Sequence, residues 1–285
     1  MSLNDFRFVH GLRVRWAEVD MQKIVFNAHY LMYFDTAITG YWRALALPYE
    51  QAMAQLGGEL YVKKASVEFH GSARFDDRLN VALKCQRIGT SSMVFSGAIF
   101  RGEVLLITCE LVYVFADPAS QTSRPVPPLL RQLIERYEAG DAVLEIRTGG
   151  WAELGIAAAN LRAAFVAEEP GSAIGMADDE ANRAGLHTVA FNALRQGVAT
   201  GRLIRGCQGS GTIGQMVVHH AVRGAGIGQA VLDALLRMAR QDGLREVVLQ
   251  APRSVEGFYR RQGFLPRVGP AAEAGPRHLE MYMPL

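Results

Sequence analysis

Lysine is scarce in this sequence and missing from most of it. The four lysines are Lys23, Lys63, Lys64 and Lys84, so arginine supplies every basic side chain in the rest of the chain. This change of composition suggests two segments with separate histories. The formal net charge is only +2, which excludes the strongly basic balance that nucleic-acid-binding and membrane-surface proteins usually have.

Cysteine and long apolar runs are also lacking. The three cysteines, Cys85, Cys109 and Cys207, have no metal-ligand spacing and leave one unpaired in any disulfide scheme, which favours a reducing compartment. No run approaches the length of a membrane span, and the N-terminus lacks the apolar core of a signal peptide. We therefore expect a cytoplasmic protein without a nucleic-acid or membrane partner. Its 285 residues are enough for two ordinary domains.

The first half of the sequence has the pattern of an α+β unit. Residues 8–16 alternate loosely as a strand does, and from Asn27, the expected N-cap, apolar residues recur on one wide helical face. A proline-rich exit and a short helix at residues 129–137 end the unit near Gly140. Between the long helix and this exit lie four strand-like runs, at residues 60–73, 79–88, 93–101 and 104–115. We expect an antiparallel sheet wrapped around one long helix.

A domain boundary near Gly140 divides the chain into residues 1–140 and 141–285. The second part mixes helices and strands, which predicts an α/β domain with a mixed central sheet. A short helix there is expected to be capped by Ser254 and to end at Gly263. The other expected helices are residues 151–168 and the segment after a glycine-rich turn. The expected strands are residues 143–147, 188–192, 198–204, 212–219, 246–250 and 278–283.

The glycine-rich turn joins a strand to an amphipathic helix. Gly224, Gly226 and Gly228 stand at alternate positions just before that helix. Glycine lets the backbone approach a ligand closely, and the first N–H groups of a helix, which have no partner within it, form a phosphate site. Gln229 stands where a dinucleotide motif needs its third glycine, and no lysine follows for a P-loop. A turn used only for tight packing is the alternative.

Several segments of the second half resemble the GNAT acetyltransferase superfamily. Arg223-Gly224-Ala225-Gly226-Ile227-Gly228 resembles its Q/R-x-x-G-x-G/A signature, and Phe258-Tyr259-Arg260-Arg261-Gln262-Gly263-Phe264 resembles its F-Y-x-x-x-G-F ending. Residues 165–170, 187–190 and 273–281 are similar to a bacterial subgroup, with Glu169 in place of the usual Gln. The resemblance covers residues 143–285.

This resemblance implies an N-acetyltransferase that uses acetyl-CoA and an unidentified amine acceptor. The turn would hold the pyrophosphate of coenzyme A, the preceding strand would pair with the pantetheine arm, and Tyr259 would protonate the leaving thiolate. Glu168, His187 and His278 remain alternatives for the general base that takes a proton from the amine. The implied coenzyme A contacts are Met216, Val217, Val218, Arg223, Gly224, Ala225, Gly226, Ile227, Gly228, Ser254 and Phe258.

Two adjacent histidines, His219 and His220, raise the question of a metal site. They fall at the end of the strand expected at residues 212–219. Adjacent residues on a strand point to opposite faces of the sheet, so the two rings are expected to lie apart. On this ground we expect no metal in the protein.

Residues 14–31 resemble the opening of hot-dog fold thioesterases of the 4-hydroxybenzoyl-CoA type, and the resemblance spans about residues 6–137. It implies that Asp20 attacks an acyl-CoA thioester or activates water, while the backbone N–H of Asn27 or a neighbour stabilises the oxyanion. Glu18 and Lys23 depart from the family pattern, which has Asp and Gly at these positions. Lys23 has three alternatives: it pairs with Asp20, contacts a coenzyme A phosphate, or points to water.

Three functions remain open at this point. The leading hypothesis is a bifunctional enzyme in which an acyl-CoA thioesterase is fused to an acetyl-CoA-dependent N-acetyltransferase. A second hypothesis keeps only the acetyltransferase active and makes the hot-dog half a dimerisation or acyl-CoA-sensing module. A third is an inactive coenzyme A-binding regulator. The unpaired sheet edges of the hot-dog half predict a homodimer or homotetramer.

Overall fold

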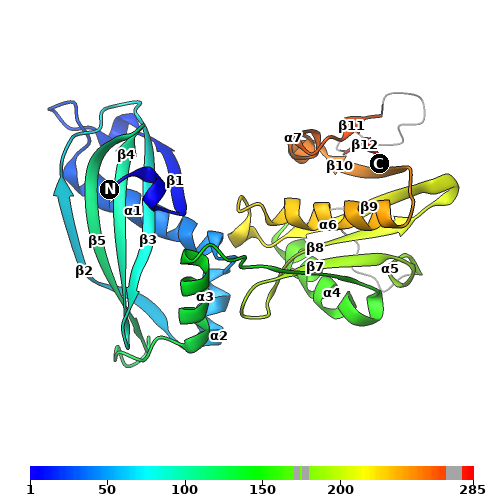
Figure 1. The fold of residues 1–285 in the computed structure, drawn as a ribbon, viewed down its shortest axis with the longest axis horizontal. Helices are drawn as coiled ribbons and strands as arrows, with labels where there is room; N and C mark the ends of the chain where they lie inside the picture. Colours follow the sequence, from blue (N-terminus) through cyan, green and yellow to red (C-terminus); the bar gives the residue numbers. More distant parts are fainter. Residues whose placement is uncertain (170–173, 175–179, 268–277) are drawn as a thin grey trace. The chain divides into compact units, whose positions relative to one another are not determined.

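The computed structural model describes residues 1–169, 174, 180–267 and 278–285. The chain divides into two compact units, Met1–Val143 and Leu144–Leu285, each with its own sheet (Figure 1). The three cysteines are free thiols, with Cys85 and Cys109 buried and Cys207 exposed. None of the helices in the described ranges is long and apolar enough to cross a membrane.

The first unit is an antiparallel sheet of five strands around one long helix, as the sequence predicts. The helix is α1 (Asn27–Ala44), and it lies so close to the sheet that a Cβ added at Gly97 would come 2.5 Å from the Phe34 ring. Tyr41 of α1 is fully buried and makes edge contacts with the rings of Phe95 and Tyr137. The sheet order is β1 (Phe8–Arg13), β3 (Arg78–Ile88), β4 (Ser92–Arg101), β5 (Val104–Ala116) and β2 (Glu59–Phe69).

Two local expectations in this unit are wrong. Phe26, not Asn27, is the N-cap of α1; it has extended backbone angles and gives no side-chain hydrogen bond, while Asn27 is the first helical residue. The sequence reasoning also missed α2 (Tyr49–Leu56), which follows Pro48 and ends at Gly57 in the left-handed conformation. The predicted short helix is present as α3 (Pro128–Glu138).

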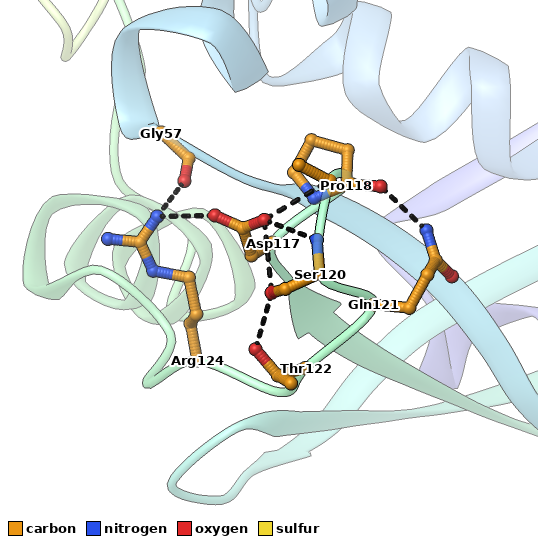
Figure 2. Close-up of polar contacts among 8 residues, drawn as sticks. Gly57, Asp117, Pro118, Ser120, Gln121, Thr122 and Arg124 are labelled. Carbon is orange, nitrogen blue, oxygen red and sulfur yellow. Dashed lines mark hydrogen bonds and ion pairs between the residues drawn. The ribbon is translucent and has the colours of Figure 1, made fainter.

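The proline-rich segment after β5 is a folded exit from the sheet (Figure 2). The Asp117 carboxylate accepts hydrogen bonds from the backbone N–H groups of Ala119 and Ser120, at 3.0 and 2.9 Å. The Arg124 guanidinium lies 3.6 Å from the same carboxylate and donates to the Gly57 carbonyl. These bonds hold the exit against the end of α2, so the segment is not a loose linker.

The second unit has a mixed sheet, as predicted. Its described residues form seven strands, one more than predicted, because the short strand at Leu265–Pro266 was not expected. Helix α4 (Trp151–Glu168) and helix α6 (Ile227–Gln241) lie on opposite faces of the sheet (Figure 1). Two shorter helices are α5 (Glu180–Ala184), which the sequence reasoning missed, and α7 (Glu256–Arg261). The sheet order is β11 (Leu265–Pro266), β12 (His278–Pro284), β10 (Glu246–Pro252), β9 (Ser210–Val218), β8 (Gly197–Arg205), β7 (Leu186–Phe191) and β6 (Glu145–Gly149).

Candidate functional site

The central strands of the second unit part from each other. Strands β9 and β10 run parallel, but they pair only from Ser210 to Thr212 on β9 and from Glu246 to Val248 on β10. Beyond Thr212, β9 bends at a bulge where Gln215 has a φ of 54°. The second half of β9 therefore has one side that no described strand of the sheet pairs with. Because the strands are parallel, their C-terminal ends lie at the same edge of the sheet.

The three glycines of the turn have different roles. Gly224 and Gly226 have φ angles of 85° and 78°, which side-chain-bearing residues rarely adopt, and a Cβ added to either would meet nothing within 4 Å. Gly228 has no such constraint on φ, but its added Cβ would lie 3.2 Å from Val218 Cγ2 and 3.9 Å from Phe258 Cζ. Two glycines therefore shape the exposed turn, and the third lets α6 approach β9 and α7.

The turn exposes a row of backbone donors. Among the residues that the structure describes, no protein acceptor is found for the N–H groups of residues 224–229, and the first bond of α6 runs from Ala230 N–H to the Gly226 carbonyl. The positive end of the α6 dipole lies behind these N–H groups. Unpaired donors of this kind at the start of a 15-residue helix form a phosphate site.

The start of the turn is fastened to the end of α4. Arg223 forms an ion pair of 2.8 Å with Glu169 and donates from Nε to the Val218 carbonyl at 3.1 Å. Its guanidinium also lies over the Phe165 ring, 5.5 Å from the ring centre. The Arg223 side chain is thus occupied in holding α4, β9 and the turn together, and its backbone N–H donates to the His220 carbonyl at 3.2 Å.

The aromatic residues of α7 lie beside this turn. Phe258 is the residue that an added Cβ at Gly228 would approach. Tyr259 is 7% exposed, and burial raises the pKa of its hydroxyl to about 12. The expected cap is wrong: Ser254 lies in a 3-10 turn (Arg253–Val255), and Val255 is the N-cap of α7. Ser254 is exposed at the end of β10 that lies on the same sheet edge as the glycine turn.

The three candidate bases have different surroundings. His187 is fully buried; its Nδ1 faces the Arg162 guanidinium at 3.2 Å and its Nε2 the Asn182 carbonyl at 2.9 Å. Since a carbonyl can only accept, His187 carries its proton on Nε2. Burial, followed by the charges of Arg162 and Arg202, lowers the pKa of His187 although the carbonyl contact acts the other way. Both ring nitrogens are engaged, which favours a structural role.

The other two candidates lie at the edge where β9 and β10 end. His278 is half-buried and pairs with Pro252, the last residue of β10. Glu168 is the last residue of α4, and its carboxylate lies 2.9 Å from His220 Nδ1. The structure thus joins Glu168 to His220, which is not one of the three bases expected from the sequence.

The expectation that His219 and His220 point to opposite faces is wrong. Strand β9 ends at Val218, and the chain turns into a 3-10 helix (His220–Val222) with His219 as its N-cap. The two rings consequently stack, with centroids 4.7 Å apart and planes inclined by 25°. Burial and the neighbouring His220 lower the pKa of His219. Ligand atoms of Glu168, His219 and His220 all lie within 4.8 Å of one another.

In the first unit, Asp20 lies in a tight loop that leads into α1. Val19 and Val25 form a bridge across the loop, and Asp20 N–H donates to the Ile24 carbonyl at 2.9 Å. The Asp20 carboxylate accepts from Gln22 N–H at 2.8 Å and is half-buried. These bonds hold the Asp20 carboxylate in a loop that leads directly into the first turn of α1.

Lys23 adopts the conformation for which the family pattern uses glycine. Its φ is 62°, in the left-handed region. Its side chain is exposed, and the contact between Lys23 and Asp20 runs through the backbone, from Lys23 N–H to the Asp20 carbonyl at 2.9 Å. Of the three alternatives for Lys23, pairing with Asp20 is therefore not the one that the structure adopts.

Glu18 is a buried carboxylate held by hydrogen bonds. It is 3% exposed and accepts hydrogen bonds from the Arg15 backbone, the Arg15 side chain and the Tyr33 hydroxyl. Burial alone would raise the pKa of Glu18, but these hydrogen bonds outweigh it and the pKa is lowered. Glu18 is therefore ionised, and its hydrogen bonds to Arg15 and Tyr33 hold the segment before Asp20 in place.

The first turn of α1 offers free donors and one unsatisfied ring nitrogen. Within the described residues, the N–H groups of Asn27 and Ala28 have no protein acceptor, and both residues are exposed. His29 Nδ1 is shielded from solvent without a hydrogen-bond partner. An unsatisfied buried polar atom costs about 1–3 kcal/mol, so it marks a position where a ligand or water fits. No sequence motif pointed to His29.

Family models match most of each unit. Residues 14–134 match the family model described as thioesterase-like superfamily, and residues 184–285 match the acetyltransferase (GNAT) domain model. The acyl-CoA thioester hydrolase YbgC of Escherichia coli O6:H1 is 28% identical over 126 residues, which are 44% of this chain and 93% of that protein. A putative esterase of Aquifex aeolicus is 28% identical over 97 residues, 34% of this chain and 75% of that protein.

Solved structures resemble the first unit as well. The probable thioesterase YbaW of Escherichia coli has a TM-score of 0.41 and 20% identity, covering 46% of this chain and 98% of its own. The two family matches assign residues 14–134 to a thioesterase-like, hot-dog domain and residues 184–285 to an acetyltransferase (GNAT) domain.

Proposed function

We propose that this protein is a bifunctional enzyme of coenzyme A thioesters, which hydrolyses an acyl-CoA in its first unit and transfers an acetyl group from acetyl-CoA to an amine in its second. One observation carries the proposal: each unit presents unpaired backbone donors at the start of a long helix, beside the residues that its family uses. These are residues 27–28 near Asp20 and residues 224–229 near the parting of β9 and β10.

In the hydrolase half, Asp20 attacks the thioester carbonyl or activates the water that does so. Negative charge then develops on the carbonyl oxygen, and the Asn27 and Ala28 N–H groups stabilise it. The carbon–sulfur bond breaks, coenzyme A leaves as a thiol, and hydrolysis yields the free acid. His29 Nδ1, for which the described residues offer no partner, accepts a hydrogen bond from substrate or water.

In the transferase half, residues 223–228 hold the pyrophosphate. The unpaired side of Met216, Val217 and Val218 pairs with the pantetheine arm. The amine attacks the acetyl carbonyl, a base takes its proton, and coenzyme A leaves. Tyr259, whose raised pKa of about 12 keeps it protonated at neutral pH, donates to the leaving sulfur. Of the candidate bases, His278 and Glu168 lie at the edge where β9 and β10 end, whereas His187 is enclosed.

The first unit is also the proposed site of self-association. Strand β2 is an edge of its sheet, and its Val62 and Phe69 side chains are 53% and 55% exposed. Leu31 and Met32 of α1 are exposed as well. An unpaired edge with apolar side chains suits pairing with a second copy, so we propose a homodimer or homotetramer. Light scattering of Phe69→Asp against the unchanged chain tests this assignment.

A thiol-release assay with two variants tests the two activities together. Without an amine, Asp20→Asn should abolish thiol release from acyl-CoA, whereas Gly226→Asp should retain it. With acetyl-CoA and a panel of amines, the amine-dependent increment should be lost in Gly226→Asp and kept in Asp20→Asn. Asp76→Asn is the control, since it removes the charge of another loop carboxylate of the first unit, one that is paired with Arg13.

The outcomes separate the hypotheses. Full hydrolysis by Asp20→Asn would contradict the role of that residue. Amine-dependent transfer without hydrolysis of any acyl-CoA would leave the first unit as a dimerisation or acyl-CoA-sensing module. Coenzyme A binding without either reaction would instead identify an inactive regulator.

A further inference from the structure

Three potential metal ligands converge beside the glycine turn. They come from two elements: Glu168 ends α4, and His219 and His220 follow the last residue of β9. The end of β9 at Val218 brings the consecutive histidine rings to one side, stacked at 4.7 Å. The Glu168 carboxylate is 2.9 Å from His220 Nδ1, and ligand atoms of all three residues lie within 4.8 Å of one another.

We propose that Glu168, His219 and His220 bind a first-row transition-metal ion, with Zn²⁺ as the best match. Two imidazoles and one carboxylate are a donor set for Zn²⁺, Co²⁺ or Ni²⁺. Magnesium and calcium ions instead prefer oxygen donors alone. Three protein ligands leave a fourth position of a tetrahedral ion open to water or to a ligand.

Coordination requires only small rotations of the side chains. Bonds of about 2.0–2.1 Å to Zn²⁺ bring ligand atoms to a little over 3 Å from one another. Glu168 and His220 already meet at 2.9 Å, and their side chains are 38% and 58% exposed, so both have room to turn. His219 is 9% exposed and accepts from Ala221 N–H at a long 3.3 Å, a weak bond for a metal bond to replace.

The surrounding charges leave the cluster available to a cation. Glu169, the residue that follows α4, is paired with Arg223 at 2.8 Å. Arg223 also donates to the Val218 carbonyl, so two contacts engage its guanidinium. The cluster is joined to the turn through backbone bonds, since Val222 N–H donates to the His219 carbonyl and Arg223 N–H to the His220 carbonyl. A bound ion would therefore fix the beginning of the turn.

Calorimetric titration of Zn²⁺ and visible absorption of Co²⁺ test the site. The full chain is used without an affinity tag and freed of metal. Cys207→Ser is the background, because thiolates in general are zinc ligands and Cys207 is an exposed thiol. We expect one Zn²⁺ per chain, and a blue tetrahedral Co²⁺ spectrum. His220→Ala and Glu168→Gln should each weaken binding at least about tenfold. His70→Ala, which removes another exposed imidazole, should not.

Both test variants change exposed side chains, so the fold should survive, and circular dichroism of the metal-free proteins verifies this. His219→Ala, which removes the third ligand, should weaken Zn²⁺ binding as well. Because His219 is buried, this variant is compared only if its circular dichroism matches that of the parent chain. Binding of one ion with equal affinity in all variants, or no saturable binding, would overturn the proposal. The titration uses neither coenzyme A nor an amine, so its failure is distinguishable from failure of the proposed enzymatic function.

Discussion

Gly228, at the start of α6, faces Phe258 of α7: a Cβ added to Gly228 would lie 3.9 Å from Phe258 Cζ, and 3.2 Å from Val218 Cγ2. A Cβ added at Gly224 or Gly226 would meet no atom of the described residues within 4 Å, yet both glycines have positive φ. Substitutions in one short turn should therefore act by different mechanisms, through packing at Gly228 and through backbone geometry and ligand access at Gly226.

Gly226→Asp should weaken coenzyme A binding at least about tenfold, which is about 1.4 kcal/mol. The substitution places a side chain and a negative charge where the proposed pyrophosphate lies, and it strains a φ of 78°. Calorimetry with coenzyme A measures the change. Gly102→Asp is the matched control, because Gly102 also has a positive φ of 60° but lies in the first unit. Unchanged affinity in Gly226→Asp would refute the assignment of the turn.

Tyr259→Phe should slow acetyl transfer about a hundredfold, the usual range for loss of a general acid. The ring remains to pack against Phe258 and Phe264, so thermal stability should change little. Burial raises the pKa of Tyr259 to about 12. The hydroxyl therefore stays protonated up to pH 10, and the transfer rate should show no alkaline decline caused by its ionisation. A rate that equals the parent rate in Tyr259→Phe would remove Tyr259 from the mechanism.

His187→Asn should make the second unit less sensitive to acid. The pKa of His187 is lowered in the folded state, so the unfolded chain binds the proton more tightly. The free energy of unfolding should then fall as the pH drops below the ordinary histidine range, by up to about 1.4 kcal/mol per pH unit. Urea unfolding at pH 8, 6 and 5 compares the variant with the parent chain. Equal pH slopes would contradict the buried neutral state; His278→Asn serves as control.

Glu18→Gln should destabilise the first unit at neutral pH by about 2 kcal/mol, the range for hydrogen bonds to a charged group. The pKa of Glu18 is lowered on folding, so its contribution is present above the ordinary carboxyl range. It is lost as the pH falls through the lowered value. The difference in unfolding free energy between parent and variant should therefore shrink in acid. A difference that is constant with pH would show that the carboxylate charge is not what stabilises the loop.

The long elements could be predicted from the sequence because they repeat a pattern many times. The helix expected at residues 151–168 is α4 with the same bounds, and the four expected strands of the first unit are present with ends shifted by a few residues. Helices α2 and α5, with 8 and 5 residues, were missed because so few positions cannot establish a helical period.

The site was less predictable where it depends on the end of an element. His219 and His220 were assigned to opposite faces because β9 was expected to continue to residue 219, one residue further than it does. That one-residue error reverses the relation of the two rings. His29 carries no sequence signal at all, since the burial of its Nδ1 results from packing that only the folded chain creates.

The distribution of lysine has a practical consequence in the folded protein. All four ε-amino groups belong to the first unit, and all four lysines are exposed there. Reagents directed at primary amines, such as biotinylating or fluorescent esters, will therefore mark only that unit. Immobilisation through these groups leaves the glycine turn and the histidine cluster chemically untouched. Acetyl-lysine found on this chain by mass spectrometry must likewise map to the unit that lacks the acetyltransferase fold.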